Sequence, residues 1–341
     1  MFSGVDISLN ATQVTTPTNT YPYPAMIETL LSYGADAKQS QLTSALFYAD
    51  QPARMDAIDF AEANRNSGLY ARSRFTAASR IVDMMGRTHA DMFFQDRYLL
   101  NEVHVKIKLI RSRNSFCLIT ANEFKVKIDS AIMFLRKVKL SPFVFLAHAK
   151  ALENSTDKYP IRRVMCKTIT ISNDFRDKSH EKLFAGQLLT RLVIALVSND
   201  SFNGAFDRNP FNFEHFNLID FRVLVRTAAV WYKTTDDQLC GWTLRASIQH
   251  AFSAEPATYK DPRVTIWTKA FFSRGYTLFA FDLTPDLGGV DHFNLTKQES
   301  MRLVLKFRNA LAQIMTAIAY AEFQNVIQID SNRNVIYDFS V

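Results

Sequence analysis

The stretch Val103-His104-Val105-Lys106-Ile107-Lys108-Leu109 alternates apolar and polar side chains without a break. Alternation with a period of two is typical of a β-strand with one face on a core and the other in water. The same pattern opens the chain, where Val5, Ile7 and Leu9 are separated by polar residues. These stretches predict a protein whose fold is decided by half-buried strands.

Comparable apolar stretches recur along the chain and predict about thirteen strands with few helices. Gly, Asn, Asp and Pro gather between them, as turns between strands require. Residues 330–333 (Asp-Ser-Asn-Arg) predict a tight turn between the last two. The expected strands are residues 5–9, 103–111, 116–120, 125–139, 163–171, 191–197, 218–225, 264–267, 276–283, 301–307, 314–323, 326–330 and 334–339.

Two short helices interrupt this pattern and suggest how the chain divides. Residues 26–33 carry apolar side chains at helical spacing before Gly34, and residues 144–152 do the same before a polar stretch at 154–160. The sequence predicts an all-β protein with two jelly-roll barrels in tandem. The expected units are an N-terminal barrel at 1–152 with a long loop insertion at 35–95, a linker at 153–160 and a C-terminal barrel at 161–341.

Composition excludes several classes of function. The chain has 341 residues, is 48% hydrophobic and contains only 10 Gly, which disfavours nucleotide folds built on glycine-rich loops. No phosphate-binding loop, dinucleotide fingerprint, hydrolase elbow or H-E-x-x-H pattern occurs. The 40 Lys and Arg against 33 Asp and Glu give a net charge of +7, densest at residues 106–113 and 136–139, where charged and apolar residues alternate.

Cys117, Cys166 and Cys240 are far apart and form no C-x-x-C pair, so we expect free thiols in a reducing compartment. Residues 1–10 lack the basic and apolar regions of a signal peptide. The longest apolar run, residues 192–197, is far shorter than the ~20 residues that a membrane helix needs. The sequence predicts a protein made in the cytosol or nucleus without a spanning segment.

One short motif suggests metal chemistry. His89-Ala90-Asp91 fits the H-x-D start of the two-His, one-carboxylate sites that bind Fe(II) in β-barrel oxygenases. His148 or His215 would complete the set. Because H-x-D is short enough to occur by chance, we favour a polar residue at a strand rim or turn.

Two other polar pairs invite an acid–base interpretation. Asp282 and Asp286 flank Pro285, and we expect them to cap a turn. Glu214-His215 lies close to Asn217, and we likewise expect a structural role for this pair and no acid–base chemistry.

Six phenylalanines lie among Asn, Asp and Arg residues in the middle of the chain. Aromatic side chains interleaved with basic ones can stack on nucleic-acid bases, but only Arg208 and Arg222 are basic here. We therefore expect a protein contact or the edge of a core. The six are Phe202, Phe206, Phe211, Phe213, Phe216 and Phe221.

Five ordered segments, spread over nearly the whole chain, resemble the hexon-type major capsid proteins of Polinton/Maverick elements and adintoviruses, which are widespread in invertebrate genomes. None of the five is a catalytic signature. The segments are residues 21–34, 145–152 with 158–160, 209–218, 281–287, and 320–326 with 329–335.

The resemblance implies a capsid protein with two eight-stranded barrels, trimers of pseudo-hexagonal outline and an icosahedral shell around double-stranded DNA. It implies no catalytic, cofactor-binding or metal-binding residues. The partners would be other copies, penton and minor capsid proteins, and DNA through weak non-specific contact. The location would be the virion, after synthesis in the host cytoplasm and assembly in the nucleus.

Sixteen strands would complete two barrels, so thirteen candidates suggest that the first barrel lacks its opening strands. Residues 226–241 also depart from the expected turn pattern, which puts the outer loop of the second barrel in doubt. Three other functions stay open. They are a penton or minor capsid protein, a β-barrel Fe(II) enzyme using His89 and Asp91, and a nucleic-acid-binding module suggested by the charge.

Overall fold

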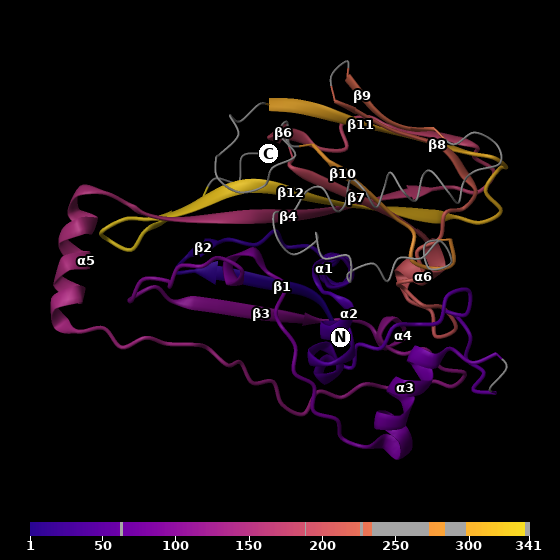
Figure 1. Cartoon of the computed structure of the whole chain (residues 1–341), viewed down its shortest axis with the longest axis horizontal. Coiled ribbons are helices and arrows are strands. Elements are labelled where there is room, and N and C mark those ends of the chain that lie inside the picture. Colours follow the sequence, from indigo (N-terminus) through magenta and orange to yellow (C-terminus); the bar gives the residue numbers. More distant parts are fainter. Residues whose placement is uncertain (62–63, 188, 226–227, 234–272, 284–297, 338–341) are drawn as a thin grey trace.

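A computed structural model describes residues 1–61, 64–187, 189–225, 228–233, 273–283 and 298–337. The described chain is built from three sheets in layers, with β4 and β12 along the long axis (Figure 1). The N-terminal elements are β1 (Phe2–Leu9), β2 (Thr12–Gln13), α1 (Pro22–Ser32), α2 (Ala35–Gln39), η1 (Gln41–Ala45), α3 (Ser67–Thr76), η2 (Ala77–Ser79), η3 (Asp91–Phe93), β3 (Val105–Arg111), α4 (Asn114–Cys117) and α5 (Pro142–Asn154).

The second half is almost entirely strands. Its elements are β4 (Asp157–Ile171), β5 (Asp177–His180), β6 (Ala185–Gln187), β7 (Arg191–Ser198), α6 (Asn199–Asn203), β8 (Leu218–Val225), β9 (Ala228–Lys233), β10 (Leu278–Asp282), β11 (Gln298–Phe307), β12 (Met315–Ile329) and β13 (Val335–Tyr337).

The central sheet is organised by one long antiparallel pair. β4 and β12 pair along all 15 residues of each, from Ile171 opposite Met315 to Asp157 opposite Ile329. On the other side of β12 lie β7, followed by β10, and β13. Among the described strands none pairs with the far side of β4, so β4 is an edge of this sheet.

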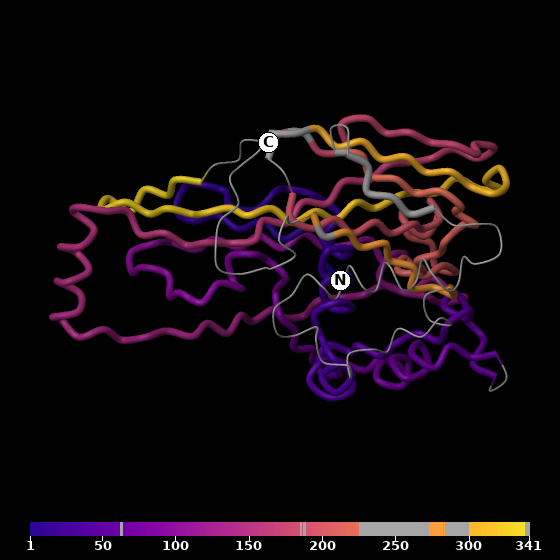
Figure 2. Tube along the Cα trace, turned by 45° about the horizontal axis from the view of Figure 1, so that its top comes forward, coloured from indigo at the N-terminus to yellow at the C-terminus, as the bar shows by residue number. Residues whose placement is uncertain are grey.

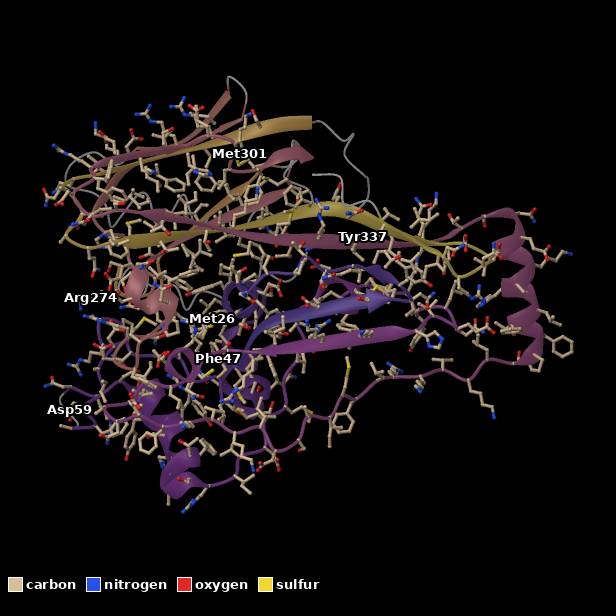
Figure 3. All side chains as sticks on the ribbon, turned by 180° about the vertical axis from the view of Figure 1, so that it is seen from behind. Met26, Phe47, Asp59, Arg274, Met301 and Tyr337 are labelled. Carbon is tan, nitrogen blue, oxygen red and sulfur yellow. The ribbon has the colours of Figure 1, made fainter. Side chains whose placement is uncertain are left out.

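A second sheet, in the order β5-β11-β8-β9 with β6 also on β11, covers one face of the central sheet. Phe221 of β8 stacks on both Phe279 and Phe281 of β10 at ring-centroid distances of 5.0 Å. Met301 of β11 lies between the two sheets (Figure 3). Each fully buried side chain of this size contributes about 1.5–3 kcal/mol, so this layer is a principal core.

The N-terminal segment covers the opposite face of the same sheet. The sheet β2-β1-β3 packs Ile7 and Leu9 against Tyr159 and Ile327, at the end nearest α5. At the other end α1 packs Ile27 and its neighbours against β7 and β12. The central strands are buried on both faces, which explains why residues 192–197 are apolar without alternation.

The expected all-β class is confirmed, and most predicted strands and both predicted helices are present. The turn at 330–333 is confirmed by the Arg333 N–H, which donates to the Asp330 carbonyl at 3.1 Å. The strands predicted at 314–323 and 326–330 are one strand, β12. The strand predicted at 264–267 lies outside the described residues.

Two predicted strands were wrong. Residues 114–117 form the short helix α4 in place of the expected strand at 116–120. Residues 125–139 belong to no strand, although their alternation is genuine, because no partner strand lies beside them in the described part of the chain. Alternation in the sequence shows only which side chains are apolar. A strand in a sheet also needs a second strand beside it with which to form backbone hydrogen bonds.

The long polar region expected as a loop also contains helices. Asn66 begins α3 as an N-cap, because its side-chain oxygen accepts hydrogen bonds from the N–H groups of Gly68 and Leu69. β4 begins at Asp157, inside the segment predicted as a linker. The division into barrels at 1–152 and 161–341 stays a prediction.

Candidate functional site

The two residues of the suspected metal motif have structural partners. His89 Nδ1 lies 2.6 Å from Glu28 Oε2 of α1. Asp91 Oδ2 accepts a hydrogen bond from the Val164 N–H at 2.9 Å. In the described part of the chain no three His, Cys, Asp or Glu side chains gather as metal ligands, so neither His148 nor His215 joins them.

Asp91 is a buried carboxyl among other charged groups. Burial raises its pKa to about 8, and the nearby Glu28 and Glu322 act in the same direction. Arg163 opposes them, and its guanidinium lies 5.1 Å from the centre of the Phe323 ring. The raised pKa favours the protonated form of this acid in the folded chain.

Glu322 connects Asp91 and its charged neighbours to the middle of the central sheet. Its Oε1 accepts a hydrogen bond from the Tyr320 hydroxyl at 2.7 Å and lies 3.3 Å from Arg191 Nη1. We call this set the polar seam, because it joins α1 and η3 to β4, β7 and β12. Its members are Glu28, His89, Asp91, Arg163, Arg191, Tyr320 and Glu322.

The second polar pair stabilises a turn. Glu214 Oε1 accepts from the Asn212 side chain at 2.9 Å, and His215 Nδ1 accepts from the Asn217 N–H at 3.0 Å. Burial raises the pKa of Glu214 and lowers the pKa of His215. Asp286 and the side chain of Asp282 lie outside the described residues.

The phenylalanine cluster belongs largely to the core. The ring of Phe202 stacks on the ring of Tyr23 in α1, with 5.6 Å between the ring centroids. The ring of Phe211 meets the Tyr23 ring edge-on, with 5.8 Å between the centroids. Phe213 and Phe221 are fully buried. Phe202 and Phe211 are half-buried against this core, as expected for a core edge.

The described cysteines, Cys117 and Cys166, are free. Burial raises the pKa of the Cys166 thiol to about 12, so this thiol is unreactive. Cys240 lies outside the described residues. Among the helices of the described chain, none has the length and apolarity to cross a membrane.

The most distinctive surface was not recognised from the sequence. Residues 123–154, here called the arm, comprise an extended segment and α5 (Figures 1 and 2). In both views the arm runs apart from the sheets and α5 lies at one end of the molecule. Nearly all arm residues are exposed, including Ile132 at 76%, Phe134 at 81% and Phe143 at 85%.

These fractions are high for such large side chains, and the exposed apolar residues are neighbours in the sequence. An exposed apolar patch of this kind marks an interaction surface. The sequence did contain a signal, since residues 132–135 are four consecutive apolar residues. We interpreted them as a buried strand because a single sequence does not show which apolar residues lack a covering layer.

The fold places the chain among the double jelly-roll proteins, as predicted. The structure of the Sputnik virophage contains a chain that matches 100% of this chain and 74% of its own length, with a TM-score of 0.56 and 10% identity. VP54 of the virus PBCV-1, fitted into a reconstruction of Sputnik, matches 99% of this chain and 83% of its own, with a TM-score of 0.50 and 9% identity.

A relative by sequence is an uncharacterised protein of the nematode Caenorhabditis elegans. It is 23% identical over an alignment that covers 93% of this chain and 75% of the relative. No family model matches the sequence.

Proposed function

We propose that the chain is a major capsid subunit, hexon-like in organisation, of an icosahedral double-stranded DNA virus or virus-like transposon. The observation that carries the proposal is the exposed apolar arm on a double jelly-roll scaffold. The proposed role is structural, with no catalytic residue and no cofactor.

The arm supports self-assembly on energetic grounds. Covering one large apolar side chain is worth about 1.5–3 kcal/mol, and the arm exposes at least ten such residues. A closed symmetric shell multiplies each contact by the number of subunits, so modest interfaces suffice. The exposed apolar residues are Phe124, Ile132, Met133, Phe134, Leu135, Val138, Leu140, Phe143, Val144, Phe145 and Leu146.

The finer features of the proposal come from the resemblance to capsid proteins of Polinton elements and adintoviruses. They are a homotrimer with a pseudo-hexagonal outline, contacts with penton and minor capsid proteins, and barrels at 1–152 and 161–341 joined at 153–160. The subunit would be made in the host cytoplasm, assembled in the nucleus and found in the virion.

The test is the solution mass of the purified chain by sedimentation equilibrium, with Phe134→Ser/Phe143→Ser as the variant. We expect the wild-type chain to form oligomers and the variant to shift toward the monomer. Phe175→Ser is the matched control, because Phe175 is also exposed, at 51%, but lies outside the arm. A wild-type monomer, or an equal shift in the control, would overturn the proposed role of the arm.

A further inference from the structure

The net positive charge of the chain comes from one stretch. Residues 104–139 contain nine Lys and Arg against two acidic residues, a net charge of +7. This equals the net charge of the whole chain, so the remaining residues hold 31 basic and 31 acidic side chains. All nine cations are exposed: Lys106, Lys108, Arg111, Arg113, Lys125, Lys127, Arg136, Lys137 and Lys139.

Two of these cations occupy one face of β3. Lys106 pairs opposite Ser8 and Lys108 opposite Asp6, whereas Ile107 pairs opposite the buried Ile7. Because side chains alternate along a strand, Ile107 faces the central sheet and both lysines face away from it. Figure 1 shows this small sheet with the central sheet on one side only.

The cations that follow β3 in sequence are held beside its end. The Arg111 guanidinium donates hydrogen bonds to the Asn114 side chain, at 2.6 Å, and to the Val126 carbonyl. Val126 lies between Lys125 and Lys127, so its anchoring places both lysines near β3. We call Lys106, Lys108, Arg111, Arg113, Lys125 and Lys127 the basic face; it combines the two lysines on the outer face of β3 with four cations at the end of that strand.

Acidic side chains neutralise little of the basic face. Among the described residues, Lys108 lies 4.0 Å from Asp6 and Lys127 lies 3.0 Å from Asp129, and the other four cations have no carboxylate within 4.0 Å. Exposed pairs of this kind contribute little. The face therefore keeps most of its charge available to a partner.

We propose that the basic face binds the phosphate backbone of double-stranded DNA, without sequence preference. The inference rests on the proposed capsid function, and it assigns the expected weak DNA contact to particular residues. Phosphate contact by Lys and Arg carries affinity but no sequence information. The basic face suits phosphate contact because its cations are exposed and lie on an extended backbone.

A second copy is a poor occupant of the same face, because six cations would meet six cations. An anionic bilayer is less well matched to the lysines of β3. Membrane-surface segments place large apolar side chains among their cations, whereas Lys106 and Lys108 share their face with Ser8 and Asp6.

The experiment measures binding of a fluorescein-labelled 30-base-pair duplex by anisotropy across a range of salt concentrations. Each phosphate contact contributes about 0.9 to the slope of log K against log salt. Lys106→Gln/Lys108→Gln should reduce the slope by about 1.8. Lys125→Gln/Lys127→Gln should do the same, and this variant alters no strand.

The matched control is Lys158→Gln/Lys306→Gln, which removes two exposed lysines from β4 and β11. Its slope should equal that of the wild type. An unchanged slope in both basic-face variants, or an equal reduction in the control, would overturn the inference. So would binding to vesicles of phosphatidylcholine and phosphatidylserine without binding to the duplex.

Sedimentation of the same samples separates the two proposals. A chain that binds DNA through these lysines but stays monomeric contradicts the capsid function and keeps the DNA site. A chain that forms oligomers but does not bind the duplex contradicts the DNA site alone.

Discussion

The side-chain carboxyl group of Asp91 accepts a hydrogen bond from the backbone N–H of Val164, with 2.9 Å between Oδ2 and nitrogen. Val164 belongs to β4, which is an edge of the central sheet among the described strands, so the bond satisfies an N–H that none of those strands pairs. An open strand edge invites pairing with another chain. The residue that suggested a metal site from its sequence context thus protects a strand edge.

The raised pKa of Asp91 predicts a specific pH dependence. Burial makes the folded state bind a proton that the unfolded chain releases near pH 4, so stability falls as the pH rises from about 4 through about 8. The loss is at most about 1.4 kcal/mol per pH unit. Asp91→Asn keeps an oxygen for the Val164 N–H and does not titrate.

Urea unfolding at pH 5 and pH 8 tests this dependence, with the two proteins compared at each pH. We expect Asp91→Asn to lose less stability than the wild type between the two values. The comparison isolates Asp91 together with its coupling to Glu28 and Glu322, because the rest of the sequence is the same in both proteins. Parallel losses in the two proteins would show that Asp91 titrates normally.

Removing the Asp91 acceptor altogether should cost more. Asp91→Ala leaves the Val164 N–H without its partner, and an unsatisfied buried group costs about 1–3 kcal/mol. Asp129→Ala is the control, because Asp129 is a half-exposed carboxylate of the arm and should change stability by less than about 0.5 kcal/mol. The midpoint of chemical unfolding measures both, and equal midpoints would contradict the role given to Asp91.

The Tyr320 hydroxyl provides a second test of the polar seam. It donates to Glu322 Oε1 at 2.7 Å in a fully buried setting. Tyr320→Phe should destabilise the fold by about 1–3 kcal/mol, because the carboxylate loses a buried donor. Tyr98→Phe removes the hydroxyl of a tyrosine that is 56% exposed and should have little effect on the melting temperature. Equal melting temperatures in the two variants would count against the seam.

Gly68 has a tight position at the start of α3. A Cβ there would lie 2.5 Å from the carbonyl oxygen of Ala49 and 2.8 Å from Asp50 Oδ1. Gly68→Ala should therefore cost about 1–3 kcal/mol through overpacking. At Gly86 the nearest atom to a Cβ is 3.4 Å away, so Gly86→Ala should be tolerated. The melting temperatures of the Gly68→Ala and Gly86→Ala variants test this difference. A Gly68→Ala variant as stable as the wild type would contradict the prediction and mean that the start of α3 can shift.

The sequence predicted what depends on neighbours along the chain. Alternation located β1 and β3, the apolar run located β7, and the helical spacing before Gly34 located α1. It failed where a distant segment decides the outcome. Residues 125–139 have the pattern of a strand, but a ladder requires a partner that the pattern does not identify.

The polar residues show the same limit. His89 and Asp91 were recognised as unusual, but their partners, Glu28 and Val164, lie 61 and 73 residues away. Before these distant partners are known, the H-x-D motif fits a metal site as well as it fits two residues that form hydrogen bonds within the fold. The net charge of +7 follows from the sequence alone. The basic face does not, because it depends on the exposure of residues 104–139 and on the pairing of β3 with β1.

The most direct test of the account is negative-stain imaging of the purified chain, with its mass in solution measured on the same sample. The account predicts particles larger than a 39.0 kDa monomer, either trimers with a hexagonal outline or closed shells. A uniform monomer at concentrations that fill the image field would contradict the proposed capsid subunit.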